Sequence, residues 1–165
     1  MAKKLLLFLL IASCTSTNDV LPIEAESNTQ TTTTEVFVKQ SLTSQDILIE
    51  IFNVYKTFSD NPMKAIDTIW NYAHEDNKEA TGPKERFAAM LVSEPYDSII
   101  DLKDYSYEII FESEENIHYE VKVLTQNNNY FVITWVFEKT VCPELDQQCW
   151  LTIAVTAPEY FQSGI

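Results

Sequence analysis

The sequence predicts an α+β domain in which N-terminal helices pack on an antiparallel sheet of about four strands. Two observations support this fold class. Apolar residues recur at helical spacing between residues 43 and 95, whereas from residue 104 onward they mostly alternate with polar ones. The joins between the alternating segments are short and polar, so consecutive strands are expected to form hairpins.

Residues 43–61 are expected to form the first helix. Thr43 or Ser44 can cap its N-terminus, and Asp46 lies in its first turn, where a negative charge is favourable. The apolar side of this helix consists of Ile47, Ile51, Val54, Tyr55 and Phe58.

Two further helices begin with a proline near the first position, which is a typical start signal. Asn61 caps the second helix, which covers residues 61–76, and the third covers residues 81–95. The apolar positions are Ile66, Ile69, Trp70 and Ala73 in the second helix and Phe87, Ala88 and Leu91 in the third.

Four segments are predicted to be strands, at residues 104–113, 116–125, 129–140 and 149–158. The joins at residues 112–116 and 126–129 contain asparagine, which tolerates left-handed backbone in turns. Period two places Tyr105, Tyr107, Ile109 and Phe111 on one face of the first strand. In the second strand, Ile117, Tyr119, Val121 and Val123 lie opposite His118, Glu120 and Lys122. The third strand is apolar on both faces, as expected of a central strand.

Composition excludes several classes of function. The net charge of −14 argues against nucleic-acid binding, which requires a basic surface, and indicates an acidic, self-repelling surface. Only two glycines occur, so the glycine-rich loops that bind phosphates and dinucleotides are excluded. Two histidines and three cysteines give no zinc-site spacing. We therefore expect no cofactor and no metal.

The N-terminus begins with the stretch "MAKKLLLFLLIASC", in which two lysines precede a short apolar run. This run is far shorter than the roughly 20 residues that span a bilayer, so a processed export signal is predicted at residues 1–13. The end of the run, Ile11-Ala12-Ser13-Cys14, resembles the lipobox of bacterial lipoproteins. The resemblance implies that Cys14 is lipidated and anchors the protein to a membrane of the cell envelope, on its periplasmic side or at the cell surface. The alternative is ordinary signal cleavage, which would release a soluble protein.

Residues 14–40 are rich in Thr, Ser and Asn without a sustained apolar period, so they are predicted to be a flexible tether to a domain at residues 41–160. Export also changes how Cys142 and Cys149 are interpreted, because disulfides form outside the cytosol. The two cysteines flank the loop between the last two predicted strands. A disulfide between them is predicted to add about 2–3 kcal/mol to the stability.

The stretch of residues 65–100, "AIDTIWNYAHEDNKEATGPKERFAAMLVSEPYDSII", resembles an uncharacterised branch of the nuclear-transport-factor-2-like superfamily. The similarity covers about residues 44–157 and rests on packing motifs rather than on chemical ones. The residues that carry it are Trp70, Tyr72, Ala73, Thr81, Gly82, Pro83, Arg86, Phe87, Met90, Leu91, Tyr96, Trp135 and Trp150. It implies a cystatin-like cone, in which the helices close over a strongly curved sheet and leave a pocket. Some members are isomerases, dehydratases or cyclases that use a carboxylate or an Asp–His pair, and others only bind.

Aromatic side chains are the candidate pocket lining: Tyr55, Trp70, Tyr96, Tyr105, Tyr107, Tyr119 and Trp135. The alternative is that they form a tyrosine-rich core. No catalytic residue is predicted. His118 shares the outer face of its strand with Glu120, and His74 lies at the end of the second helix, where it would cap the helix or be exposed. His74, Glu75 and Asp76 could bind a hard cation, although exposed acidic runs usually only interact with water.

Two functions follow from these expectations. The first is an envelope lipoprotein that binds a protein or a small molecule, or that has a structural role, through its cone-shaped domain. The alternative is a cofactor-free isomerase or dehydratase, or a carrier of a small apolar ligand, that uses the cone pocket. Pairing of two copies through their sheets, which would give a homodimer, is a further possibility.

Overall fold

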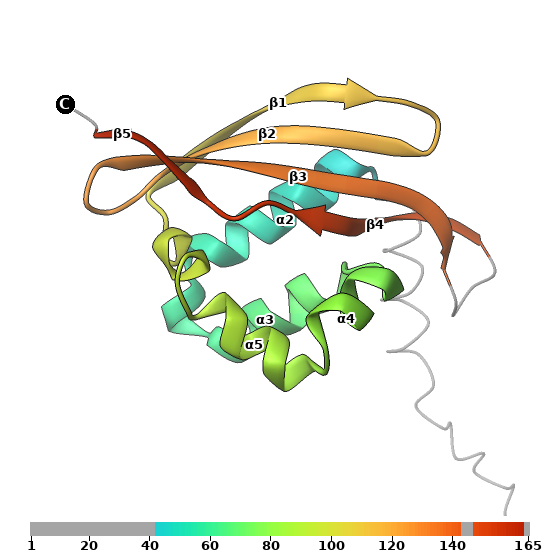
Figure 1. The fold of residues 1–165 in the computed structure, drawn as a ribbon, viewed down its shortest axis with the longest axis horizontal. Helices are drawn as coiled ribbons and strands as arrows, with labels where there is room; N and C mark the ends of the chain where they lie inside the picture. Colours follow the sequence, from blue (N-terminus) through green and yellow to red (C-terminus); the bar gives the residue numbers. More distant parts are fainter. Residues whose placement is uncertain (1–41, 143–146, 164–165) are drawn as a thin grey trace, which may run out of the picture.

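The computed structural model describes residues 42–142 and 147–163 and confirms an α+β fold with an antiparallel sheet (Figure 1). The predicted signal peptide, Cys14 and the tether lie outside these residues. The helices are α2 (Ser44–Lys56), α3 (Pro62–Asn71), α4 (Glu75–Thr81) and α5 (Lys84–Leu91), with short 3-10 turns η1 (Phe58–Asp60) and η2 (Tyr96–Ile99). The strands are β1 (Asp104–Glu112), β2 (Asn116–Leu124), β3 (Asn129–Cys142), β4 (Gln147–Val155) and β5 (Glu159–Ser163).

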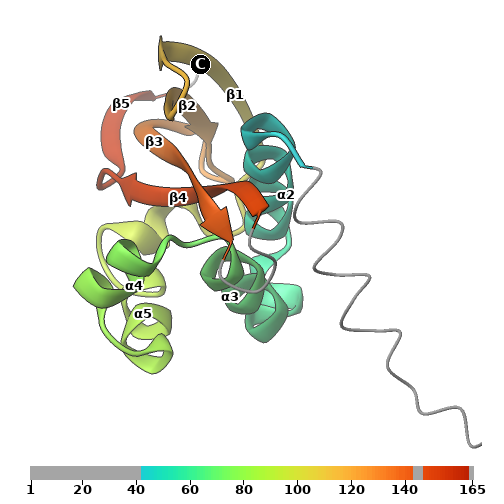
Figure 2. The ribbon, with the colours of Figure 1, turned by 90° about the vertical axis from the view of Figure 1, so that its right-hand side faces the viewer.

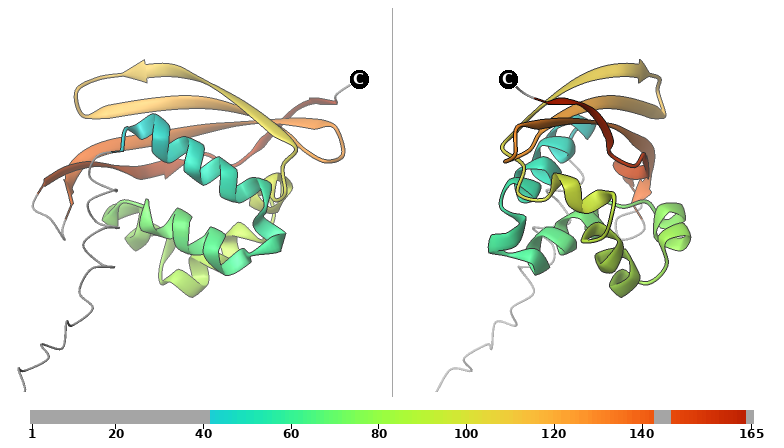
Figure 3. Two further views of the ribbon diagram at one scale, coloured as in Figure 1. Left: turned by 180° about the vertical axis from the view of Figure 1, so that it is seen from behind. Right: turned by 60° about the vertical axis from the view of Figure 1, so that its left-hand side comes forward.

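The helices α2 to α5 lie on one face of the sheet. Helix α2 runs along that face, while α3, α4 and α5 form a second layer below it (Figures 1 and 3). The sheet order is β1-β2-β3-β4, and β5 also pairs with β3. β4 pairs with residues 135–142 of β3 and β5 with residues 129–132, so the long central strand has two partners along one edge. The fifth strand is an addition to the four that the sequence predicts. No helix within residues 42–142 and 147–163 is long and apolar enough to cross a membrane.

The helix starts follow the predicted capping chemistry. Thr43 caps α2 through a capping box, in which its hydroxyl accepts the Asp46 N–H at 3.1 Å and Asp46 Oδ2 accepts the Thr43 N–H at 3.0 Å. Asn61 caps α3 by accepting the Lys64 N–H at 3.1 Å, and Pro62 follows at the first helical position. These bonds satisfy backbone donors that have no partner within the helix.

The core lies between α2 and the inner faces of β2 and β3. Val121, Val123 and Phe137 are fully enclosed there, and the predicted alternation of β2 is confirmed along its whole length. The buried face of α2 is wider than predicted, because Leu48 and Phe52 are also fully enclosed. This width is expected for a helix that contacts a sheet on one side and other helices on another.

The prediction for β1 is wrong in one respect. Its register shifts between Ile109 and Phe111, so Phe111 pairs with His118 and its ring lies 4.8 Å from the His118 ring. A bulge inserts one residue into a strand and reverses the facing of the side chains beyond it. Phe111 therefore lies on the outer face, opposite the face that it shares with Tyr105 and Tyr107 in the sequence-based assignment.

The second helix is also shorter than predicted. α3 ends at Asn71, and residues 75–81 form a separate helix, α4, with His74 as its N-cap. The His74 Nδ1 accepts the Asp76 N–H at 3.1 Å. His74 therefore lies at the positive start of a helix and not at the negative end where the sequence-based assignment places it.

Cys142 and Cys149 form the predicted disulfide, with their Cα atoms 5.8 Å apart. They lie on neighbouring strands β3 and β4, near the end of this hairpin where the two strands are connected. Both are buried together with Leu151 in a small apolar cluster that is separate from the main core. The bond therefore fixes the end of the hairpin that the main core does not reach.

Candidate functional site

A cavity of about 270 Å³ lies between β4 and the second layer of helices. Five helical segments (α2, α3, α4, α5 and η2) and two strands surround it. Tyr55 comes from α2 and Trp135 from β3, and most of the other lining residues come from α4, α5 and β4. Its volume is slightly below the range of about 300–1,000 Å³ that is usual for ligand sites, so it suits a small molecule. The apolar lining consists of Ile69, Ala73, Ala80, Phe87, Met90, Leu91, Ile153, Ala154 and Val155.

Thr152 holds the helical layer against the sheet at the wall of this cavity. Its N–H donates to the Tyr72 carbonyl at 2.7 Å, and its own carbonyl accepts the His74 N–H at 2.8 Å. The Asn77 side-chain amide donates to the same carbonyl at 3.2 Å. These bonds fix the segment between α3 and α4 directly beside β4. Figure 2 shows the following helix, α4, next to the same strand.

Trp135 forms another part of the wall and depends on the same threonine. Its indole Nε1–H donates to the Thr152 hydroxyl at 2.9 Å, and only 2 % of the residue is exposed. Its ring also contacts Phe52 edge-on, with 5.5 Å between centroids. The indole is therefore held in one orientation by a buried hydrogen bond and by packing, which gives the cavity a fixed wall.

The structure places three of the seven predicted aromatic residues at the cavity, namely Tyr55, Tyr96 and Trp135. Trp70 lies behind the cavity wall, where it packs on Phe87 with ring centroids 5.1 Å apart.

The other three predicted aromatic residues lie between α2 and the strands β1 and β2. Tyr119 is buried there and shares a hydrogen bond of 2.9 Å with the Ser44 hydroxyl. Tyr107 accepts a hydrogen bond from the Gln45 side chain, and Tyr105 stacks on Tyr107. These three tyrosines therefore belong to the core and its edge, and they do not border the cavity.

Sequence reasoning missed the contribution of α4, which supplies Asp76, Asn77, Ala80 and Thr81 to the lining. A signal for this helix was present. Two acidic residues in the first turn and Gly82 directly after the last turn are typical helix boundaries. Gly82 has φ +86°, a backbone conformation that glycine adopts most readily.

The polar groups of the cavity are few. Asp76 is the one charged residue among the described residues that line it, and 77 % of its side chain is exposed, so it lies at the mouth. The neighbouring Glu75 pairs with Lys78 at 2.8 Å. Within residues 42–142 and 147–163, no group of three or more His, Cys, Asp or Glu side chains could hold a metal ion.

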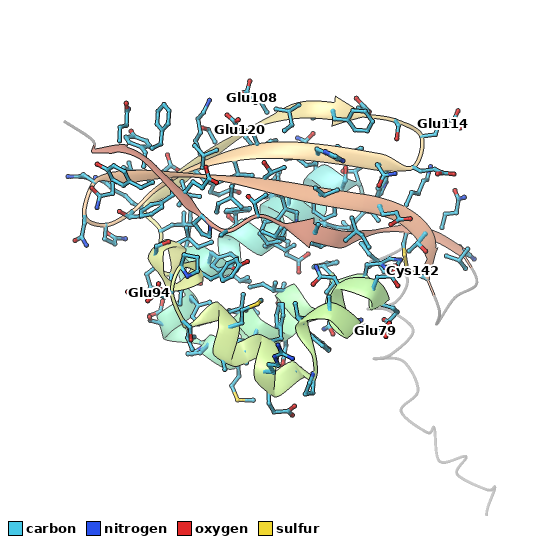
Figure 4. All side chains as sticks on the ribbon, viewed as in Figure 1. Glu79, Glu94, Glu108, Glu114, Glu120 and Cys142 are labelled. Carbon is cyan, nitrogen blue, oxygen red and sulfur yellow. A yellow bond between two sulfur atoms is a disulfide. The ribbon has the colours of Figure 1, made fainter. Side chains whose placement is uncertain are left out.

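Within residues 42–142 and 147–163, His118 and the acidic residues other than Asp76 do not line the cavity. Glu120 and Glu108 flank Lys122 on the outer face of the sheet, each with an oxygen 3.2 Å from its amino group. Figure 4 shows Glu108 and Glu120 projecting above the sheet, whereas Glu79 projects from α4 on the opposite side of the molecule. The acidic surface is thus spread over both sides of the domain.

Comparisons with known proteins add no assignment: no family model, no curated protein and no solved structure matches this chain. The geometry of the cavity is therefore the basis for a functional proposal.

Proposed function

We propose that this chain is an exported envelope lipoprotein whose α+β domain binds a small, largely apolar molecule in the cavity between β4 and the helices. In this proposal Cys14 carries the lipid anchor, and the domain is a cone of the nuclear-transport-factor-2-like type. The observation that carries the binding function is the cavity of about 270 Å³ with a mostly apolar lining and a few polar groups. This combination is typical of small-molecule sites.

The rigidity of the walls supports the same function. Thr152 joins β4 to the α3–α4 segment through backbone bonds, and its hydroxyl orients Trp135. A pre-formed site loses less conformational entropy when a ligand binds, so its apolar surface contributes more of its free energy to affinity.

An isomerase or dehydratase in the same cavity would need a base beside the reacting atom. Of the described residues that line the cavity, Asp76 alone carries a carboxylate, and it is mostly exposed at the mouth. A general base must lie within hydrogen-bond reach of the proton that it removes, whereas this carboxylate lies at the mouth and not among the residues deep in the cavity. The geometry therefore supports binding over proton transfer.

The test uses a neutral fluorescent probe, N-phenylnaphthylamine, whose emission rises in apolar surroundings. The protein is the full-length chain with Cys14→Ser, which cannot be lipidated at residue 14. Ala80 and Ala154 line the cavity and are exposed, so a larger side chain there can cover the cavity without displacing the core. We expect saturable binding to the parent chain and loss of at least tenfold in affinity for Ala80→Trp.

The matched control is Ala89→Trp, which introduces the same side chain at an exposed position of α5 that does not line the cavity. It should bind the probe as the parent does. Equal affinity of the parent, Ala80→Trp and Ala89→Trp would show that the probe binds elsewhere and would refute the proposal. Mass spectrometry of the mature N-terminus, with Cys14→Ser as control, tests the lipid anchor separately.

A further inference from the structure

The hydroxyl of Tyr55 differs from those of the other buried tyrosines. Tyr72 donates to Glu50 Oε2 at 2.7 Å, and Tyr119 bonds Ser44 at 2.9 Å. Tyr55 is more deeply buried than either, with 1 % of its surface exposed. Yet no group within residues 42–142 and 147–163 forms a hydrogen bond with its hydroxyl. Buried hydroxyls normally have a partner, so this one needs an explanation.

The cavity provides that explanation. In the described part of the chain, every side-chain nitrogen or oxygen that is completely enclosed has a hydrogen-bond partner. The Tyr55 hydroxyl has none there, so the small exposed fraction of this residue must lie at the hydroxyl. Because the ring is packed against Phe52 and Phe58 and the residue lines the cavity, the hydroxyl faces the cavity. It is thus a polar group that is directed into an apolar space.

Four of the other described polar side chains in the wall are already bonded to the protein, and the remaining two, Tyr96 and Asp76, are more exposed than Tyr55. Thr81 donates to the Asn77 carbonyl at 2.8 Å, the Asn77 amide donates to Thr152, and the Thr152 hydroxyl accepts the Trp135 indole. Burial raises the pKa of Tyr55, and the nearby Tyr96, which also lines the cavity, raises it further. The Tyr55 hydroxyl therefore keeps its proton and can act as a donor.

We infer that the cavity selects a neutral molecule with an apolar body and one oxygen that accepts a hydrogen bond from Tyr55. This inference rests on the proposed function. A carbonyl compound meets this description. An anionic ligand is disfavoured, because no Lys, Arg or His is among the described lining residues and Asp76 lies at the mouth. A hydrocarbon of the same shape would fill the cavity but leave the hydroxyl without a partner.

The test compares three probes of nearly equal shape: acetylnaphthalene, isopropenylnaphthalene and naphthoate. Their affinities for the full-length Cys14→Ser chain are measured by displacement of N-phenylnaphthylamine. A neutral hydrogen bond favours the ketone over the hydrocarbon by about two- to twelvefold. Naphthoate should bind more weakly than both neutral compounds.

The variant Tyr55→Phe should remove the preference for the ketone and leave the affinity for the hydrocarbon unchanged. The matched control is Tyr119→Phe, which removes a buried hydroxyl outside the cavity and should keep the preference. A second measurement needs no variant: the carbonyl carbon resonance of the bound ketone should move downfield, as it does in hydrogen-bonded ketones.

The outcomes separate this inference from the proposed function. Equal binding of ketone and hydrocarbon to the parent chain, or a preference that survives in Tyr55→Phe, overturns the role of Tyr55 but leaves the cavity as a binding site. Tighter binding of naphthoate overturns the selection for a neutral molecule. If no probe binds, and Ala80→Trp changes nothing, the proposed function itself fails.

Discussion

The substitution Thr152→Val tests whether one buried hydrogen bond maintains the cavity wall. Valine has nearly the shape of threonine, and the backbone bonds from residue 152 to Tyr72 and His74 do not depend on the side chain. The substitution therefore removes one interaction, the acceptor of the Trp135 indole N–H at 2.9 Å.

The expected loss of stability is large because the buried indole N–H of Trp135 no longer has a hydrogen-bond acceptor. Trp135 is 2 % exposed, so its N–H cannot exchange the lost acceptor for bulk water. A buried donor without a partner destabilises a protein by about 1–3 kcal/mol. For a domain of this size that corresponds to a fall in melting temperature of about 4–12 °C.

The assay is urea and thermal unfolding followed by circular dichroism. The matched control is Thr156→Val, which removes a hydroxyl that accepts the Thr134 N–H at 2.9 Å. Because Thr156 is exposed, water can replace that acceptor, and we expect a loss below about 1 kcal/mol.

A double-mutant cycle with Trp135→Phe assigns the loss to the pair. In the phenylalanine background there is no indole N–H, so Thr152→Val should have little effect on stability and the coupling should exceed about 1 kcal/mol. A Thr152→Val variant as stable as Thr156→Val, or an effect unchanged in the phenylalanine background, would refute the assignment.

Three further outcomes are expected. Replacing both Cys142 and Cys149 by alanine should lower the free energy of unfolding by about 2–3 kcal/mol, because the short loop between them is no longer closed. Thr43→Ala should lower it by about 1 kcal/mol through loss of the capping box at the start of α2. Stability should fall as the pH rises above about 10, because burial raises the pKa of Tyr55 and of Tyr72 in the folded state while tyrosines in the unfolded state ionise near 10.

Each of these has a result that would contradict it. Reduction of the parent chain should give the same loss as the double alanine variant, and no loss on reduction would exclude a stabilising role for the disulfide. Hydrogen bonds from Thr43 lower the pKa of Asp46, so Thr43→Ala should raise that pKa, and an unchanged value by NMR would exclude the capping box. Tyrosine ionisation near pH 10 for all residues of the folded chain would contradict the alkaline prediction.

The sequence predicts the fold class correctly because most strands have one face in the core. In β2, buried and half-buried residues alternate from Ile117 to Val123 as the polar pattern requires. The helix caps at Thr43 and Asn61 are likewise local features, since each is determined by residues within one turn. Patterns that act over a few residues are therefore sufficient for these elements.

The errors arise where local patterns compete with tertiary pairing. The segment Tyr105–Phe111 alternates well, yet pairing with β2 introduces a bulge that turns Phe111 to the outer face. Residues 75–81 carry too few apolar residues to predict a helix by period. They form one because His74 caps it and Thr152 anchors the preceding segment. Neither the bulge nor this anchor can be inferred from neighbouring residues alone.

The cavity shows the same limit at the level of single atoms. Tyr55 and Tyr119 follow the predicted core pattern and are buried, and Tyr72, which lies outside that pattern, is buried as well. The position of a ring along the chain does not determine the partner of its hydroxyl, which depends on what lies across the core. Glu50 bonds one hydroxyl and Ser44 another, whereas the third meets the cavity. The sequence pattern thus predicts the burial of Tyr55 and Tyr119, but only the packed structure distinguishes a hydroxyl that is bonded to the protein from one that faces a cavity.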